Sequence, residues 1–148
     1  PPLMAGPEAR GLARFVNEWA DRVVNPALVP IIIADILDDA TEADQENFRT
    51  TREARFGCSL EEVCGDLEAR LATFSKALEP ARSTLRHQDY LSGSQPGYAD
   101  YILFGCLQWA RCTSAVTLIP ADDPVYGWRE KLLDMFDGYA RKAPGHAV

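Results

Sequence analysis

The residues of this sequence that could do chemistry are its clustered aspartates, its cysteines and its histidines. Asp35, Asp38 and Asp39 form one acidic cluster, and Asp122 with Asp123 forms another. Carboxylates are good ligands for hard cations, but neither cluster has the alternating oxygen-donor spacing of a calcium loop. We therefore interpret both clusters as surface turns and helix caps.

The four cysteines, Cys58, Cys64, Cys106 and Cys112, fall into two pairs with five residues between the members of each pair. Six positions along a helix amount to about 600° of rotation, which places the two thiols well apart around the axis. Neither pair has a Cys-x-x-Cys chelating motif or a nearby histidine. We expect buried, reduced thiols, as in a cytosolic protein, and no metal site.

No local pattern of an enzyme active site is present. The sequence lacks a glycine-rich phosphate loop, the HExxH pattern, Gly-x-Ser-x-Gly and a local cysteine–histidine pair. We therefore assign no catalytic residue to the chain.

Length and charge narrow the class of protein further. A chain of 148 residues fits one domain, and its 15 Lys and Arg against 22 Asp and Glu, without a basic stripe, argue against nucleic acid as a partner. The longest apolar run, residues 27–34, contains a proline and is too short to cross a bilayer. The chain begins Pro1, Pro2, Leu3, with neither an initiator methionine nor a leader, so we expect it to be a fragment.

The aromatic residues are the more informative candidates for binding. Trp19 and Trp109 lie inside the two helices most expected to pack together, and a buried indole N–H needs a partner. Tyr101 and Gln108 likewise add polar tips to an otherwise apolar helix. These residues could be core packing or could line a pocket for an aromatic ligand, and both interpretations stay open.

The elements that position these residues all show a helical period, and no run alternates strictly between apolar and polar residues. The sequence therefore predicts an all-α protein. The first helix should start near Pro7 and run to Val24, with Pro26 and Pro30 kinking or breaking it. Further helices are expected over residues 31–37, 41–57, 59–78, 80–85, 98–115 and 124–139.

The helix from Tyr98 is apolar on every side, so we expect other parts of the protein to surround it. Gly105 inside it predicts that another helix crosses closely there. Asp100 is the only carboxylate in this helix. If Gly97 is the N-cap, Asp100 is the third helical residue, where it can accept the Gly97 backbone N–H and favour the positive end of the helix dipole.

This region is where the sequence resembles a known family. The segment YLSGSQPGYADYILFGCLQWAR, residues 90–111, resembles the sixth helix and preceding loop of glutathione S-transferases, with Gly97 in place of the family's capping Ser or Thr. Three further segments agree with this resemblance in their order along the chain: FRTTREARFG, LEPARSTLRHQDYLSG and DDPVYGWREKLLDMFDGYAR. Together they are similar to the bacterial β-etherase-type transferases and the fungal FuA class.

The resemblance implies that residues 1–148 are the C-terminal domain alone, a bundle of about five to seven helices around one buried central helix. The thioredoxin-like domain that binds glutathione would be absent from the chain. The resemblance also implies a hydrophobic site for aromatic or lignin-derived substrates. Five residues are expected to line it: Trp19, Ala20, Val23, Tyr101 and Trp109.

The same resemblance implies a cytoplasmic enzyme of xenobiotic detoxification, acting on glutathione and a small hydrophobic molecule. Its partners would be the thioredoxin-like domain and a second copy in a homodimer. The alternative is a non-catalytic helical domain that binds apolar ligands or a protein partner. A thioredoxin-like half encoded upstream of Pro1 would distinguish the two.

Overall fold

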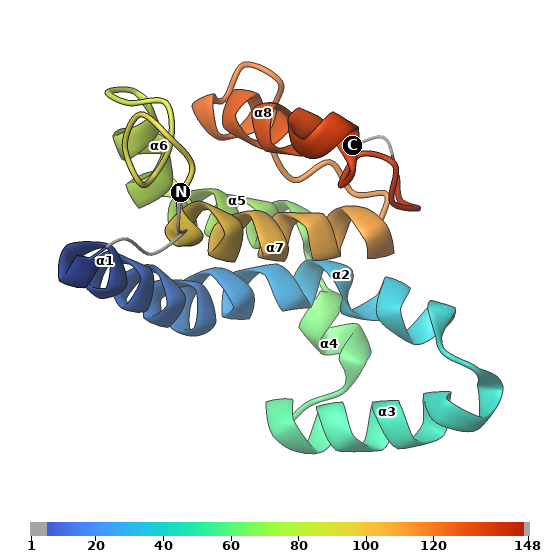
Figure 1. Ribbon diagram of the computed structural model, residues 1–148. Coiled ribbons are helices and arrows are strands. Elements are labelled where there is room, and N and C mark those ends of the chain that lie inside the picture. Colours follow the sequence, from blue (N-terminus) through green and yellow to red (C-terminus); the bar gives the residue numbers. More distant parts are fainter. Residues whose placement is uncertain (1–5, 147–148) are drawn as a thin grey trace.

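The computed structural model describes residues 6–146, which form helices and turns and contain no strand. The all-α prediction is confirmed, and the opening Pro1 to Leu3 lies outside the described residues. With α1, η1 and α2 taken as one continuous helix, the described residues hold seven helical segments. The elements are α1 (Gly6–Trp19), the π-helical turn η1 (Ala20–Val24), α2 (Asn25–Asp39), α3 (Glu42–Phe56), α4 (Leu60–Cys64), α5 (Leu67–Ala77), α6 (Glu79–Leu85), α7 (Tyr98–Thr113) and α8 (Pro124–Gly138) (Figure 1).

The long first helix passes through its prolines without ending. Trp19 and Asn25, on either side of η1, are both helical, and the Asn25 N–H bonds the Ala20 carbonyl five positions back. A proline ring in an α-helix collides with the carbonyl four residues before it. The wider π turn directly before Pro26 relieves that collision. The predicted break is therefore absent, and a local change of helix geometry replaces it.

Helix α7 lies in the middle of the bundle, with the α1–α2 helix on one side and α8 on the other (Figure 1). Its inward side packs against Leu28 of α2, Phe74 of α5 and Leu132 of α8 in one core. The buried residues of α7 are Ala99, Asp100, Leu103, Phe104, Cys106, Leu107 and Ala110.

One face of α7 stays open. The side chains of Tyr98 and Trp109 are 43% and 42% exposed. Gly105, on the same face, is exposed too, and a Cβ built there meets nothing within 4 Å. The predicted close helix crossing at Gly105 is wrong, and the described residues leave this face of α7 uncovered.

Helix α3 lies on the far side of α2 from α7 (Figure 1). None of its residues is buried, in keeping with its polar sequence. It ends where predicted, because Gly57 adopts the left-handed conformation with φ 74°. At its start, the Thr41 hydroxyl donates to the Asp44 carboxylate at 2.6 Å and caps no backbone N–H, so Thr41 and Asp44 form no capping box.

The helix expected over residues 59–78 is two helices, and its predicted continuity is wrong. Its start is right: the Glu62 N–H donates to the Ser59 hydroxyl at 3.2 Å, and the Ser59 N–H donates to the Glu62 carboxylate at 2.9 Å. Helix α4 then ends at Cys64, and Asp66, with φ 53°, caps α5 by accepting the Ala69 N–H at 3.1 Å.

Candidate functional site

The carboxylate of Asp100 is completely buried and accepts four hydrogen bonds. Oδ1 accepts the Leu91 backbone N–H at 2.7 Å and the Trp128 indole N–H at 2.9 Å. Oδ2 accepts the backbone N–H groups of Ser92 at 3.1 Å and Gly97 at 3.0 Å. The expected bond to Gly97 is thus present. This one side chain ties the start of α7 to the preceding loop and to α8.

The same geometry makes Asp100 unsuitable as a general acid or base. Both oxygens are occupied by donors of the chain, and a catalytic carboxyl must reach the proton of a substrate. Gly97 has no side chain to complete the capping box, so only the carboxylate half exists here. The role of Asp100 is to satisfy backbone donors at the end of a buried helix.

The two other polar residues of α7 that the sequence singled out bond to the C-terminal part of the chain. The Tyr101 hydroxyl donates to the Met135 sulfur at 3.7 Å, and Gln108 Nε2 donates to the Ala140 carbonyl at 2.9 Å. Burial, and to a lesser degree the negative charge of Asp100, raise the pKa of Tyr101, so its hydroxyl stays protonated at neutral pH.

The five residues expected to line one hydrophobic site are spread over different surroundings. Ala20 is 2% exposed inside the core, whereas Val23 is 45% exposed. Tyr101 is half-buried and packs against the core. Trp19 and Trp109 each line a cavity, but the cavities are different ones. The structure therefore does not bring these five side chains together in a single cavity.

The larger of these two cavities lies between α2 and α3 and measures about 360 Å³. Its apolar lining comes mainly from one side of α2, and Trp109 of α7 adds an aromatic wall. Two phenylalanines and two arginines of α3 line it as well. The lining residues are Asp21, Asn25, Pro26, Val29, Ile33, Ile36, Phe48, Arg52, Arg55, Phe56 and Trp109.

Polar groups at this cavity are few and distinct. The Asn25 Oδ1 atom is buried without a hydrogen-bond donor among the described residues. The Arg52 guanidinium lies over the Phe48 ring, 4.8 Å from its centroid. Asp21 accepts the amide of Asn17 at 2.9 Å. An apolar pocket with a few placed polar groups is the usual form of a small-molecule site.

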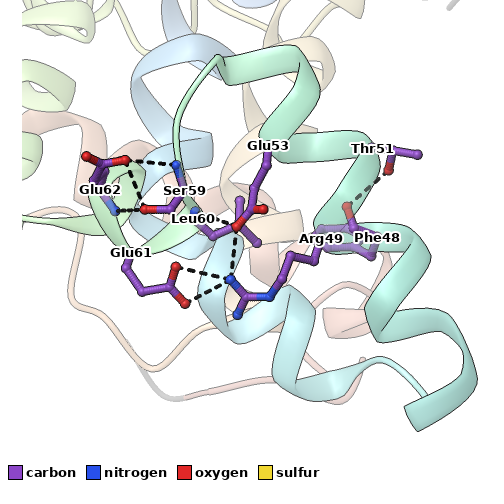
Figure 2. A network of polar contacts seen from close by, with 8 residues as sticks. All are labelled: Phe48, Arg49, Thr51, Glu53, Ser59, Leu60, Glu61 and Glu62. Atoms are coloured by element: carbon purple, nitrogen blue, oxygen red, sulfur yellow. Dashed lines mark hydrogen bonds and ion pairs between the residues drawn. The ribbon is translucent and has the colours of Figure 1, made fainter.

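Helix α3, which closes this cavity, is fastened to α4 by Arg49 (Figure 2). Arg49 Nη1 donates to Glu53 at 3.0 Å and to Glu61 at 2.9 Å. Glu53 Oε1 also accepts the Leu60 backbone N–H at 3.1 Å. Backbone hydrogen bonding, with Arg49 second, lowers the pKa of Glu61, so this attachment is ionised at neutral pH.

The sequence offered a signal for the α3 side of the cavity that our reasoning from the sequence missed. Phe48, Arg52, Arg55 and Phe56 are spaced by four, three and one, which places them along one face of a helix. The composition of the whole segment is that of a polar helix. Two aromatic rings on the same face as two arginines could have indicated a ligand-facing side.

The smaller cavity, about 150 Å³, lies between α1 and α6. Leu12, Phe15 and Trp19 line its α1 side, and Phe15 is 71% exposed. The Trp19 indole N–H is buried without an acceptor among the described residues. Trp19, one of the five residues expected to line the hydrophobic substrate site, therefore lies at this smaller cavity.

The described residues contain no group of three or more His, Cys, Asp or Glu side chains placed to hold a metal ion. All four thiols are free. Cys106 is buried as expected, but Cys58 and Cys112 are exposed, which corrects the prediction that all are buried. Burial raises the pKa of Cys106 and of Cys64. Within residues 6–146, none of the helices has the length and apolar character required to cross a membrane.

Comparisons with known proteins agree with this helical architecture. Residues 11–117 match the family model described as "Glutathione S-transferase, C-terminal domain". The chain is also similar to the crystal structure of glutathione transferase GSTFuA3 from Phanerochaete chrysosporium, with a TM-score of 0.67 and 22% sequence identity. That match covers 93% of this chain and 53% of the other, so the chain spans about half the length of the solved structure. At this identity the likeness concerns the fold.

Proposed function

The chain belongs to the glutathione S-transferase family through its C-terminal domain, and we propose that it supplies the hydrophobic substrate site of an intact glutathione transferase. The observation that carries the proposal is the cavity between α2 and α3, to which Trp109 contributes. In this proposal an aromatic substrate, such as a lignin-derived or xenobiotic compound, binds there. Catalysis requires a thioredoxin-like domain.

Glutathione is the co-substrate that the family implies. It is a polar tripeptide with two carboxylates and an amine, whereas the larger cavity is lined mostly by aliphatic and aromatic side chains. That lining suits an aromatic molecule better. We assign glutathione mainly to the thioredoxin-like domain, in a cytoplasmic enzyme that works as a homodimer.

The test is a kinetic comparison on the intact protein with its upstream sequence. With an aromatic halide as the electrophile, Trp109→Ala should raise KM for the halide several-fold and leave KM for glutathione unchanged, because only the aromatic wall is removed. Tyr139→Ala is the control, since Tyr139 is 80% exposed and lines neither of the two cavities described above. Equal effects of the two variants would contradict the assignment of the cavity.

A second candidate is a non-catalytic domain that binds apolar ligands. The observation that suits it is the apolar lining that α2, α3 and α7 give the larger cavity. A gene without a thioredoxin-like half upstream of Pro1, together with aromatic binding by the chain, would favour this candidate over the transferase.

A further inference from the structure

The arginines of α3 divide into two groups by their partners. Arg49 is held by two carboxylates and fastens α3 to α4 (Figure 2). Arg52 and Arg55 lie one and two turns further along, and both line the larger cavity. Neither has a carboxylate within ion-pair distance among residues 6–146, although the chain carries a net charge of −7. Two guanidinium groups are therefore left available at an aromatic cavity.

Their chemistry selects for a planar anion. A guanidinium presents a fixed fork of N–H donors that matches the planar carboxylate group with two parallel hydrogen bonds. The Arg52 group is already positioned by its contact with the Phe48 ring. Asp21 is the one carboxylate of the lining, and it accepts the Asn17 amide. The formal charge of the lining is thus +1.

The α2 side of the cavity selects for a second feature of the ligand. Asn25 Oδ1 is a buried acceptor without a donor in the described part of the chain, and Asn25 lines the cavity. A buried carbonyl oxygen that lacks a donor is costly, and a hydroxyl group on a ligand would satisfy it. Trp109 and the two phenylalanines offer ring faces and edges for an aromatic body.

We propose that the cavity between α2 and α3 binds a hydroxylated aromatic acid, with its acid group on Arg52 and Arg55 and its hydroxyl donating to Asn25 Oδ1. This inference rests on the proposed function only in taking the cavity as the aromatic site. It adds the charge and the hydroxyl of the ligand, which family membership does not supply.

Calorimetric titration of the full chain with three matched probes tests the proposal: hydroxynaphthoate, the neutral hydroxynaphthamide, and naphthoate without the hydroxyl. The acid should bind about tenfold more tightly than the amide, since two partly exposed ion pairs contribute modestly. The hydroxylated acid should bind more tightly than plain naphthoate. Raising the salt concentration should narrow the difference between acid and amide.

Variants of the chain show which side chains cause the preferences for the acid and for the hydroxyl. The double variant Arg52→Gln with Arg55→Gln should remove the preference for the acid over the amide. The charge-matched control, Arg10→Gln with Arg14→Gln, changes two exposed arginines of α1 outside the cavity and should leave the preference intact. Asn25→Ala should remove the preference for the hydroxyl while the preference for the acid remains.

Failure of this inference and failure of the proposed function give different results. If all three probes bind equally and Trp109→Ala abolishes their binding, the cavity is an aromatic site and the inference about charge is wrong. If none binds, the assignment of the cavity falls, and the proposed function with it. Displacement of the acid by millimolar glutathione would also overturn the inference, because the arginines would then serve the tripeptide.

Discussion

Replacing Asp100 with Asn should destabilise the fold severely, although the two side chains have nearly the same shape. Each carboxylate oxygen of Asp100 accepts two hydrogen bonds from the chain. An amide keeps one oxygen and presents an NH₂ group to the two remaining donors, whichever way it is turned. The substitution therefore loses two hydrogen bonds and sets donors against donors.

The magnitude follows from that count. Hydrogen bonds to a charged group contribute about 1.5–3 kcal/mol each, so two lost bonds correspond to ~3–6 kcal/mol of unfolding free energy. A domain of ordinary stability has only about 5–15 kcal/mol in total. Because the carboxylate also anchors α8, Trp128→Phe should cost ~2–3 kcal/mol by removing the indole donor. The two changes together should cost less than their sum, since they share one bond.

Urea unfolding followed by circular dichroism measures these free energies, with tryptophan fluorescence as a second probe of the transition. Asp38→Asn is the matched control, because Asp38 is exposed and no hydrogen bond joins its side chain to another described residue. Should Asp100→Asn prove too unstable to purify, Trp128→Phe carries the measurement. A loss below about 1 kcal/mol for Asp100→Asn would refute the view that all four bonds stabilise the native state.

Three smaller predictions follow from the same local geometry. Gly97→Ser restores the missing half of the capping box and should raise the unfolding free energy by a few tenths of a kcal/mol, measured by urea unfolding; a loss would contradict this. In a thiol-titration assay on the native protein, Cys58 and Cys112 should react at once, and Cys106, buried and with a raised pKa, only on unfolding; equal rates would contradict the burial. Hydrogen bonds from the backbone N–H and the hydroxyl of Ser59 lower the pKa of Glu62 from 4.5. The contribution of Glu62 to stability is therefore complete above pH 4.5 and is lost as the pH falls through the lowered pKa. Glu62→Gln should flatten that part of a curve of unfolding free energy against pH, and an unchanged curve would refute this prediction.

The sequence predicted the helical class and most helix starts because those depend on local chemistry. Ser59 with Glu62 and Asp123 before Pro124 mark helix starts in the structure as they do in the sequence. The break at Asp66 was missed for a physical reason. The apolar positions from Leu60 to Leu78 keep a helical spacing across it, so periodicity alone cannot show that Asp66 leaves the helix and caps the next one.

The candidate site was predicted less well, because it depends on how two helices meet. Trp109 was identified, but the α3 side of the cavity was not. None of the α3 residues is buried, so its sequence has the composition of a solvated helix. Its inner face becomes the wall of a cavity because contacts with other elements hold α3 there: Arg49 and Glu53 bond to α4, and Gln45 bonds to the end of α2. Such a contact between elements leaves little trace in the pattern of one helix.

The error about Gly105 draws attention to apolar surface that the described residues leave uncovered. Helix α7 is apolar on every side, yet its outward face carries an exposed Trp109 and Tyr98. Tyr98 and Leu12 of α1 line a common depression, and Leu12 continues to the exposed Phe15. The depression at Tyr98 and Leu12 shares no lining residue with the cavity between α2 and α3, whereas Trp109 belongs to that cavity. For the proposed transferase we infer that the thioredoxin-like domain packs against α1 and the start of α7, while the aromatic ligand enters between α2 and α3.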